Sequence, residues 1–460
     1  MPGIRDTVYG EVFRRVLQPA WESGLRRRPT LAYWHHLERT QWASRDELEG
    51  MQLAQVQKLL RHAWQNVPFY RARMERAGLG PDGVRHLEDV RKLPIVYRDE
   101  ANANAEARRS TAPPLPTMKK VTSGSSGVPL AFGYDVDSDY WRNAVKMRGY
   151  GWAGWRPGDP VVHFWGAVAK KASLKTRMWV KTDRRIRREY MFDCGVRGEA
   201  ELLAVIELIK QVRPTMMVCY TQAAADLARF LLERPHLKPF DTMPVLCGAE
   251  RLFPADRQIM EKVYGKGLFE TYGSREVMLM GAETEAHEGL LVPMENILLD
   301  VVVREHGKER LAEPGETGEV VVTDLHNFGM PFIRYANGDL ATMGPRAPSP
   351  CGRHHMRLAG IEGRVTETLT DAKGAPVNGL VFNVMFSTLG YTVRQFQAVQ
   401  HKDRSVTLRV VPNEKFDADA KKIVYAQAEK YLTGLPFKLE IVQDIATSPS
   451  GKRHVVVVER

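Results

Sequence analysis

Apolar residues recur at helical spacing along the first part of the chain. In the segment 44–67 they repeat every three or four positions, which predicts one amphipathic helix. Ser44 with Glu47 three residues later is a capping-box sequence, and Pro68 marks where the helix ends. A second helix is expected over 69–76, before a glycine-containing turn.

From about residue 115 to residue 345 the pattern changes to short apolar strands that alternate with amphipathic helices. The expected helices cover 199–212, 223–233 and 255–264, and the expected strands cover 216–220, 245–247 and 268–272. This order predicts right-handed crossovers and an α/β fold with a largely parallel sheet. Ligands of such sheets bind at the carboxyl ends of the strands.

The last third of the chain is predicted to be richer in strands. Two apolar runs, 297–303 and 318–325, are expected to pair, with Gly315 and Gly318 marking the turn between them. After Arg364 the pattern predicts a small α+β unit. Its expected helices cover 379–389 and 417–433, and its expected strands cover 392–400, 405–411, 437–443 and 454–459.

These patterns predict two domains. The larger, 1–363, contains a helical part over 1–100 and an α/β core over 115–345, and the smaller covers 364–460. The length of 460 residues is too great for one small core, and the 43% hydrophobic content is typical of a globular protein.

The composition also limits where the protein works. No apolar run approaches the roughly 20 residues needed to span a bilayer, so no membrane span is expected. The N-terminus lacks the apolar core of a secretory signal. The four cysteines form no CxxC pair, which favours a reducing cytoplasm over a disulfide framework.

The net charge of +11 is unevenly distributed. Residues 170–188 contain nine Lys or Arg against one Asp. One interpretation is a solvated loop, and the other is a landing surface for an anionic partner such as a phosphorylated cofactor or an acidic carrier protein. No zinc finger or RNA-recognition signature supports nucleic acid as a partner.

Two short segments carry the candidate chemistry. Residues 122–129, TSGSSGVP, offer backbone N–H groups and small hydroxyls suited to an anionic phosphate chain, although a plain Gly/Ser linker is the alternative. Apolar residues on both sides predict a hairpin tip. Near the other end, 449–452 places Lys452 on a glycine-containing turn, where an exposed lysine without a role is the alternative.

Several motifs occur in an order that resembles adenylate-forming enzymes. They are TSGSSGVP at 122–129, YGSRE at 272–276, RYANGD at 334–339, Gly363-Arg364 and PSGK at 449–452. The phrase HAWQNVPFY at 62–70, followed by Leu93-Pro94, is similar to the phenylacetate–CoA ligase branch, including its CapK-like members. The resemblance covers nearly the whole chain.

The resemblance implies a nucleotide site. In this family the first motif closes over the β- and γ-phosphates, so the implied cofactor-binding residues there are Thr122, Ser123, Gly124, Ser125, Ser126 and Gly127. The implied adenine-side residues are Gly248, Ala249, Glu250, Tyr272 and Gly273. Ser274 is expected near the α-phosphate and Asp339 on the ribose hydroxyls, with Arg364 beside ribose or phosphate oxygens.

The resemblance also implies catalytic roles. Glu276 is expected to bind Mg²⁺, because a hard cation prefers carboxylate and phosphate oxygens. Lys452 is expected to bridge the substrate carboxylate and the α-phosphate, and to stabilise charge in the transition state. Arg364 is grouped with them as catalytic. Where relatives have Asp after Gly-Arg at the hinge, this chain has Glu367.

The resemblance also has implications for the acid pocket and for a zinc site that some relatives contain. The implied pocket residues are Trp165, Tyr220, Thr221, Gly248 and Gly273, with ordinary core aromatics as the alternative. Such a pocket suits a flat, aromatic or compact acid. No structural zinc is expected, because His287 and Cys351 remain while Thr284 and Ser349 stand at positions where the zinc site would need cysteines.

The function implied is ATP- and Mg²⁺-dependent activation of a carboxylic acid, followed by transfer to the thiol of coenzyme A. The C-terminal domain is expected to rotate between the two steps. One alternative keeps adenylation but transfers the acyl group to an amine, a hydroxyl or a carrier-protein thiol. A second is a non-catalytic nucleotide-binding or nucleic-acid-binding protein. The sequence leaves open whether the protein forms a homodimer.

Overall fold

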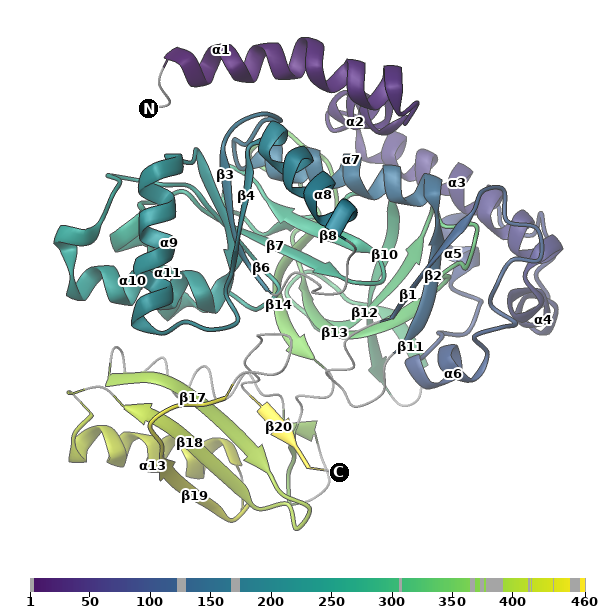
Figure 1. The fold of residues 1–460 in the computed structure, drawn as a ribbon. Coiled ribbons are helices and arrows are strands. Elements are labelled where there is room, and N and C mark those ends of the chain that lie inside the picture. Colours follow the sequence, from purple (N-terminus) through teal and green to yellow (C-terminus); the bar gives the residue numbers. More distant parts are fainter. Residues whose placement is uncertain are drawn as a thin grey trace.

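A computed structural model gives the fold of the chain (Figure 1). It describes residues 4–121, 130–166, 174–305, 308–364, 369–372, 376–377, 392–412, 414, 416–432, 434–446 and 456–459. A sheet of twelve strands with helices around it forms the larger part, and a sheet of four strands forms a smaller part below it in Figure 1. This arrangement confirms the predicted α/β class with a small C-terminal unit.

The large sheet is mixed. Its strands, in spatial order, are β11 (Lys308–Leu311), β10 (Ile297–Glu305), β12 (Thr317–Asp324), β13 (Tyr335–Met343), β14 (Arg357–Arg364), β9 (Leu290–Leu291), β8 (Met278–Glu283), β7 (Leu268–Ser274), β6 (Val245–Gly248), β5 (Met216–Tyr220), β3 (Val161–Trp165) and β4 (Glu189–Asp193). From β7 to β4 neighbouring strands are parallel, whereas the pairs from β7 to β11 are antiparallel.

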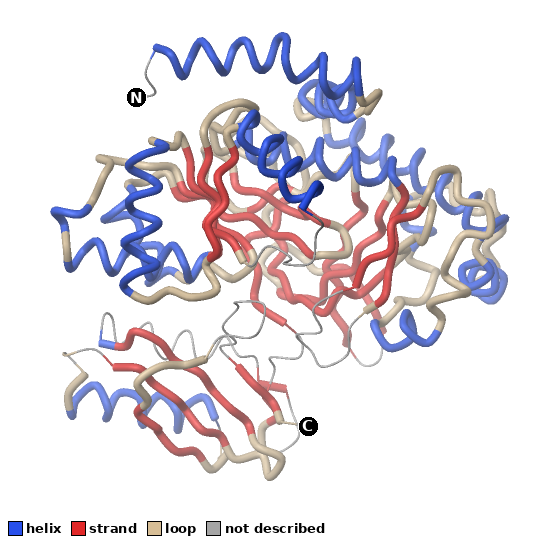
Figure 2. Tube along the Cα trace, in the orientation of Figure 1, coloured by secondary structure: helices blue, strands red, loops and turns tan. Residues whose placement is uncertain are grey.

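Helices surround this sheet, as the blue segments of Figure 2 show. In chain order they are α1 (Ile4–Val12), α2 (Thr30–Thr40), α3 (Arg45–Asn66), α4 (Pro68–Arg76), α5 (Leu87–Val90), α6 (Arg98–Ala103), α7 (Val136–Trp152), α8 (Leu174–Arg187), α9 (Glu199–Val212), α10 (Thr221–Glu233) and α11 (Pro254–Tyr264). Two π-helical segments, Phe13–Leu17 and Ala20–Leu25, follow α1, and a 3₁₀ turn covers Pro235–Leu237. No helix of the described ranges is long and apolar enough to cross a membrane.

Local sequence explains where several helices begin. At α3, the Glu47 backbone N–H donates to Ser44 Oγ at 3.3 Å, and the Ser44 N–H donates to Glu47 Oε2 at 2.8 Å. This is the predicted capping box, and it satisfies two N–H groups of the first turn. Pro68 stands at the first position of α4, where it needs no N–H partner.

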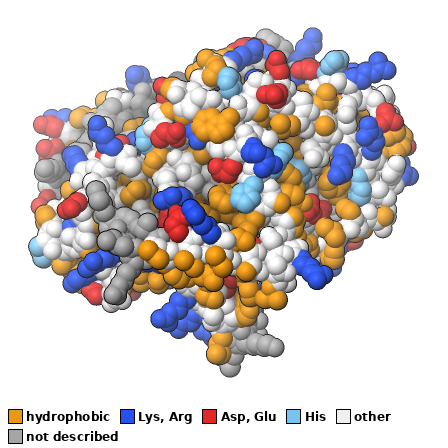
Figure 3. Space-filling model, turned by 90° about the horizontal axis from the view of Figure 1, so that it is seen from above, with side chains coloured by type: hydrophobic (Ala, Val, Ile, Leu, Met, Phe, Trp, Pro, Cys, Tyr) orange, Lys and Arg blue, Asp and Glu red, His pale blue; other side chains and the backbone are white. Residues whose placement is uncertain are grey.

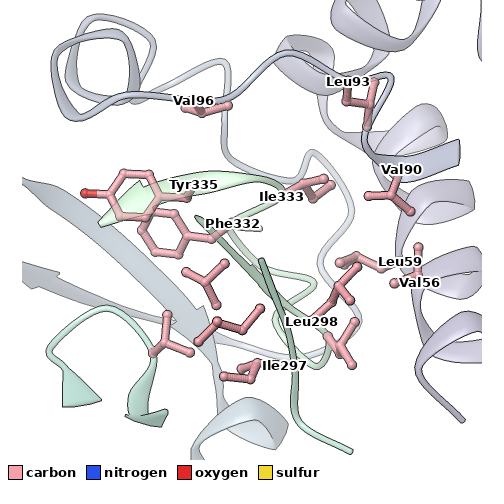
Figure 4. Close-up of a cluster of buried hydrophobic side chains, with 14 of the residues drawn as sticks. Val56, Leu59, Val90, Leu93, Val96, Ile297, Leu298, Phe332, Ile333 and Tyr335 are labelled. Atoms are coloured by element: carbon pink, nitrogen blue, oxygen red, sulfur yellow. The ribbon is translucent and has the colours of Figure 1, made fainter. Parts of the chain in front are cut away.

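The parallel strands are covered on both faces. Apolar residues of α9, α10 and α11 pack on one face, and residues of α2 and α7 pack on the other. This double cover explains why the strands read as continuous apolar runs. A further cluster fills the space between α3, the segment 84–96 and the antiparallel strands. Figure 4 shows part of it, with Leu59, Val96, Ile297, Phe332 and Tyr335 among the labelled side chains.

Among the described residues, three smaller sheets accompany the large one. Strands β1 (Thr117–Val121) and β2 (Ala131–Asp135) form an antiparallel pair with Val121 opposite Ala131. The four-stranded sheet contains β19 (Phe437–Ile441), β18 (Val406–Pro412), β17 (Val393–Gln400) and β20 (Val456–Val458), and α13 (Ala418–Leu432) packs on it. The short strands β15 (Leu369–Thr370) and β16 (Pro376–Val377) pair with each other.

The structure corrects three expectations. Gly318 lies inside β12 and does not mark the turn, although Gly315 does adopt a positive φ of 88° before that strand. An unpredicted strand, β11, pairs with β10. The basic stretch contains the helix α8, so its interpretation as a loop was wrong over Leu174–Arg187. The expected helix 379–389 lies outside the described residues, and the domain boundary at Arg364 stays a prediction.

Candidate active site

The loop that follows β6 has an unusual backbone. Ala249 has φ of 66°, in the left-handed region that a residue with a Cβ rarely adopts. The Thr221 hydroxyl donates to the Glu250 carbonyl at 2.8 Å, and the Gln222 N–H donates to Glu250 Oε2 at 3.1 Å. The start of α10 therefore holds this loop in place, at the carboxyl end of a parallel strand.

The predicted adenine-side tyrosine and the predicted ribose carboxylate touch each other. The Tyr272 hydroxyl donates to Asp339 Oδ2 at 2.9 Å, and Asn337 Nδ2 donates to the same oxygen at 2.8 Å. Burial and then the Asp339 carboxylate raise the pKa of Tyr272 well above its usual value, so this hydroxyl remains a donor. Three strands separate β7 from β13 in the sheet order, so the sheet must curve to bring these residues together.

Glu276 is buried beside a cation that no sequence motif indicated. Arg98 Nη2 lies 3.4 Å from Glu276 Oε1. Arg98 begins α6, and the chain just before it runs along β13, where the Val96 N–H donates to the Arg334 carbonyl at 2.8 Å. Within the described ranges, no group of three or more His, Cys, Asp or Glu is arranged to hold a metal ion.

The turn from β7 to β8 requires glycine at Gly273. A Cβ added there would lie 2.3 Å from the Met278 carbonyl oxygen, so a larger residue would force the hairpin apart. Ser274 Oγ accepts the Val277 N–H at 3.2 Å and closes the turn. These contacts fix the turn that carries Glu276, and they give Gly273 a structural reason to be glycine.

Residues predicted to line the acid pocket lie at three neighbouring strand ends. Trp165 at the end of β3 meets Tyr220 at the end of β5, with ring centroids 4.6 Å apart and planes at 76°. A Cβ added to Gly248 would lie 3.2 Å from Trp165 Cη2, so the indole lies directly over that glycine. Thr221 is fully buried and bonds the adjacent loop, which makes it a support of the pocket rather than a wall.

The remaining predicted residues fall at the edges of the described structure. Arg364 is the last residue of β14 and pairs in register with Asp339 on β13. The segment 122–127 lies outside the described residues. The strands on either side of it, β1 and β2, pair with each other as expected for a hairpin. Lys452 also lies outside the described residues. Its role stays a prediction.

A cavity of about 430 Å³ opens next to the strand that carries Tyr272. Its lining residues are Arg257, Glu261, Lys266, Glu270, Glu283, His287, Gly289, Leu290 and Ala359. Burial, followed by the Glu283 carboxylate, raises the pKa of Glu270 to about 7. Glu270 Oε1 accepts the Leu252 N–H at 3.4 Å, which links the cavity to the loop after β6. In the sequence, the only signal for this cavity was Glu270, a charged residue within a predicted strand.

Known proteins are similar to this chain in sequence. The model of the CapK C-terminal domain family matches residues 369–459. Phenylacetate-coenzyme A ligase of Aromatoleum evansii is 30% identical over 346 residues, which cover 72% of this chain and 74% of that protein. Protein CapK of Staphylococcus aureus is 22% identical over 94% of each chain.

A solved structure shows the same fold. The crystal structure of 2-hydroxyisobutyryl-CoA ligase in the postadenylation state superposes with a TM-score of 0.73, at 22% identity, and covers 92% of each chain. The fold class is therefore that of the adenylate-forming ligases. The chain belongs to the phenylacetate–CoA ligase family, in the branch that also includes CapK. The resemblance found in its motifs is confirmed.

Proposed function

We propose that the protein is an AMP-forming ligase that uses ATP to activate a carboxylic acid and then forms a thioester with coenzyme A. The observation that carries this proposal is the contact between Tyr272 and Asp339, beside the loop after β6. A half-buried carboxylate held by two donors, next to a strained loop at the ends of parallel strands, suits a ribose and its base. The relative from Aromatoleum evansii is named as a coenzyme A ligase.

The proposed nucleotide position uses the predicted residues in turn. The base lies against the backbone of 248–250 and Tyr272, and the ribose hydroxyls donate to Asp339. The phosphate chain reaches the hydroxyls and N–H groups of 122–127, where small residues allow a close approach. Arg364 is opposite Asp339 in the strand pairing and is proposed to contact ribose or phosphate oxygens.

Magnesium fits the donors that the chain offers. Mg²⁺ is usually held by one or two carboxylates together with substrate phosphates, and Glu276 supplies one buried carboxylate at this position. When bound, Mg²⁺ would neutralise phosphate charge. Arg98, at 3.4 Å from Glu276, is positioned to orient that carboxylate.

The proposed reaction has two balanced steps. First, a carboxylate oxygen of the acid attacks the α-phosphorus of ATP, and the bond to the bridging oxygen breaks, so that pyrophosphate leaves. Second, the sulfur of coenzyme A attacks the acyl carbon, loses its proton and expels AMP. Lys452 would screen the repulsion between carboxylate and phosphate in the first step, and binding both in one cleft supplies proximity.

The acid proposed is flat or compact. Trp165 lies over Gly248 and meets the edge of Tyr220, so two aromatic rings border the space at these strand ends. Aromatic walls favour an aromatic ring in offset or edge contact. An aryl acid is therefore the proposed substrate class.

A second acceptor is favoured by one observation. The CapK C-terminal domain model matches residues 369–459, and that domain is proposed to receive the acyl acceptor. An amine, a hydroxyl or a carrier-protein thiol could replace coenzyme A as the nucleophile without any change in the adenylation step. Mass analysis of products, with and without coenzyme A, separates the two candidates.

The test is exchange of labelled pyrophosphate into ATP across a panel of aryl, amino-aryl and short aliphatic acids. We expect acid-dependent exchange, highest with an aryl acid. Lys452→Ala should slow exchange by at least about 100-fold, because it removes the charge that stabilises the transition state. Binding of ATP, measured by calorimetry, should change little.

Lys402→Ala is the matched control, because it removes an exposed lysine of the same C-terminal unit and should retain full exchange. Acid-independent exchange in the wild type, or full exchange in Lys452→Ala, would contradict the proposal.

A further inference from the structure

The N-terminal arm, residues 4–28, packs against α8 and forms one surface with it. Trp21 stacks on Trp179 with ring centroids 5.9 Å apart. Arg187 Nη2 of α8 lies 2.5 Å from Glu22 Oε1. The Tyr9 hydroxyl donates to the Ile186 carbonyl at 2.7 Å. The arm and the basic helix are therefore held together, and their outer sides form what we call the arm–α8 surface.

This surface exposes large apolar side chains. Val8, Val12 and Val16 follow one another at four-residue spacing, and Val8 and Val16 are more than half exposed, at 58% and 57%. Met178 on α8 is 71% exposed. The other exposed apolar residues of this surface are Leu17, Leu25, Trp179 and Ile186. Figure 3, which looks down on the side where α1 lies, shows a band of hydrophobic side chains with Lys and Arg beside it.

The charge on this surface is one-sided. The acidic residues of this surface whose side chains the structure describes pair with arginines of the arm and α8: Glu11 with Arg14 and Arg15, Glu22 with Arg28 and Arg187, and Asp183 with Arg187. The exposed basic residues are Arg15, Arg26, Arg27, Arg177, Lys181 and Arg185. Apolar side chains bordered by exposed guanidinium and ammonium groups are typical of helices that lie in the interface of an anionic bilayer.

We propose that the arm–α8 surface binds the surface of an anionic phospholipid membrane. The valines, Met178 and Trp179 would enter the headgroup region, and the basic residues would contact lipid phosphates and anionic headgroups. This mode lies on the bilayer and needs no spanning helix, so the absence of such a helix from the described ranges does not conflict with it.

Two other occupants fit the same surface less well. A second copy of the chain would place like charges against each other across a symmetric contact, which is costly. An acyl carrier protein would have to deliver its thiol to the site, but this surface lies on the opposite side of the large sheet from the four-stranded C-terminal sheet (Figure 1). Binding to an extended anionic surface requires neither a contact between like charges nor delivery of a thiol to the site.

Vesicle sedimentation with the full chain tests the proposal. We expect binding to vesicles that contain about one third phosphatidylglycerol in phosphatidylcholine, and at least about tenfold weaker binding to phosphatidylcholine alone. Raising the NaCl concentration to about 0.5 M should weaken binding, because the Debye length falls to a few ångströms. The variant Arg177→Gln/Lys181→Gln/Arg185→Gln should bind at least about tenfold more weakly.

Two further variants separate the contributions. Val8→Ser/Val12→Ser/Val16→Ser keeps every charge and should also lose binding, because it removes apolar area that would enter the interface. Lys402→Gln/Lys421→Gln/Lys422→Gln removes the same charge from exposed positions of the C-terminal unit and should bind like the wild type.

Several outcomes would overturn the proposal. Equal binding to both vesicle types, no binding to either, or an equal loss in the C-terminal control would each do so. The proposal would also be overturned if analytical ultracentrifugation showed a dimer of the wild type that is lost in the valine variant, while neither protein binds vesicles. A stable complex with an acidic carrier protein in place of vesicle binding would also count against it. Pyrophosphate exchange without vesicles should be the same in all variants, which keeps this test separate from the proposed function.

Discussion

At the residue scale, the site depends on contacts between residues far apart in the sequence. The motifs indicated Tyr272 and Asp339 separately, each as a ligand contact, but gave no sign that the two bond to each other or that Asn337 joins them. Arg98 beside Glu276 was missed altogether, because nothing local to either residue reports the pairing. Individual residue types were predictable from motifs, and their partners were not.

Two buried tyrosines allow the effect of a hydrogen-bond partner on stability to be measured. Tyr272→Phe removes a donor and leaves the Asp339 carboxylate with fewer partners, so we expect the free energy of unfolding to fall by about 1–3 kcal/mol. Tyr335 is also buried, but its hydroxyl has no hydrogen-bond partner among the described residues. Tyr335→Phe should therefore change stability by less than about 0.5 kcal/mol or increase it slightly. Urea titrations followed by tryptophan fluorescence compare the two, and equal losses would refute this account.

At the element scale, the sequence predicted much of the parallel part of the sheet. The helix over 199–212 and the strand over 216–220 have the bounds expected, because periodicity and proline punctuation are local signals. The short strand β11 was missed because its four residues, KERL, carry little apolar pattern. The left-handed backbone at Ala249 was also missed, since glycine and not alanine is the usual signal for it.

The left-handed backbone at Ala249 predicts that an alanine-to-glycine substitution changes stability in opposite directions at two positions. Ala249→Gly should stabilise the protein by about 1 kcal/mol, because an L-residue in the left-handed region costs about 1–2 kcal/mol that glycine avoids. Ala204 lies exposed inside α9, and there the same change should destabilise by about 1 kcal/mol. Midpoints of the first urea transition give both values. A loss of stability in Ala249→Gly would show that the loop does not adopt this conformation.

At the scale of the whole molecule, one buried carboxylate joins the N-terminal helices to the sheet. Glu295 accepts from Thr40 Oγ1 at 2.7 Å, from Arg148 Nη2 at 3.0 Å and lies 3.1 Å from His355 Nε2. Burial alone would raise its pKa, but Arg148 and His355 outweigh burial and hold the pKa well below its usual value. These four residues come from distant parts of the chain, so no sequence pattern could have predicted the cluster.

Glu295→Gln should destabilise the protein by about 3–5 kcal/mol, because it leaves the Arg148 guanidinium buried without its counter-charge. Since the pKa of Glu295 is lowered in the folded state, the Glu295 carboxylate contributes to the free energy of unfolding at neutral pH. The gap in stability between variant and wild type should therefore be full above about 4.3, the unfolded pKa, and should narrow as the pH falls below that value towards the lower folded pKa. Urea titrations at a series of pH values measure this gap.

Glu285→Gln is the control for this prediction. Glu285 is 59% exposed and pairs with Arg353 at 3.3 Å, so its loss should cost less than about 1 kcal/mol. A gap for Glu295→Gln that stays constant down to acid pH, or one no larger than that of the control, would contradict the assignment of Glu295 as an ionised anchor.

Asp339 on β13 and Arg364 on β14 are direct partners in the strand pairing. If the C-terminal unit rotates, as the family resemblance implies, and the pivot is at the predicted boundary Arg364, then the pivot is the direct strand partner of the carboxylate that we propose for the ribose. A nucleotide that binds one orientation more tightly must then shift the equilibrium towards it by the ratio of the two affinities. If ATP and AMP favour different orientations, the two would act as opposing effectors of interdomain geometry, and single-molecule fluorescence between two labelled sites would report each population.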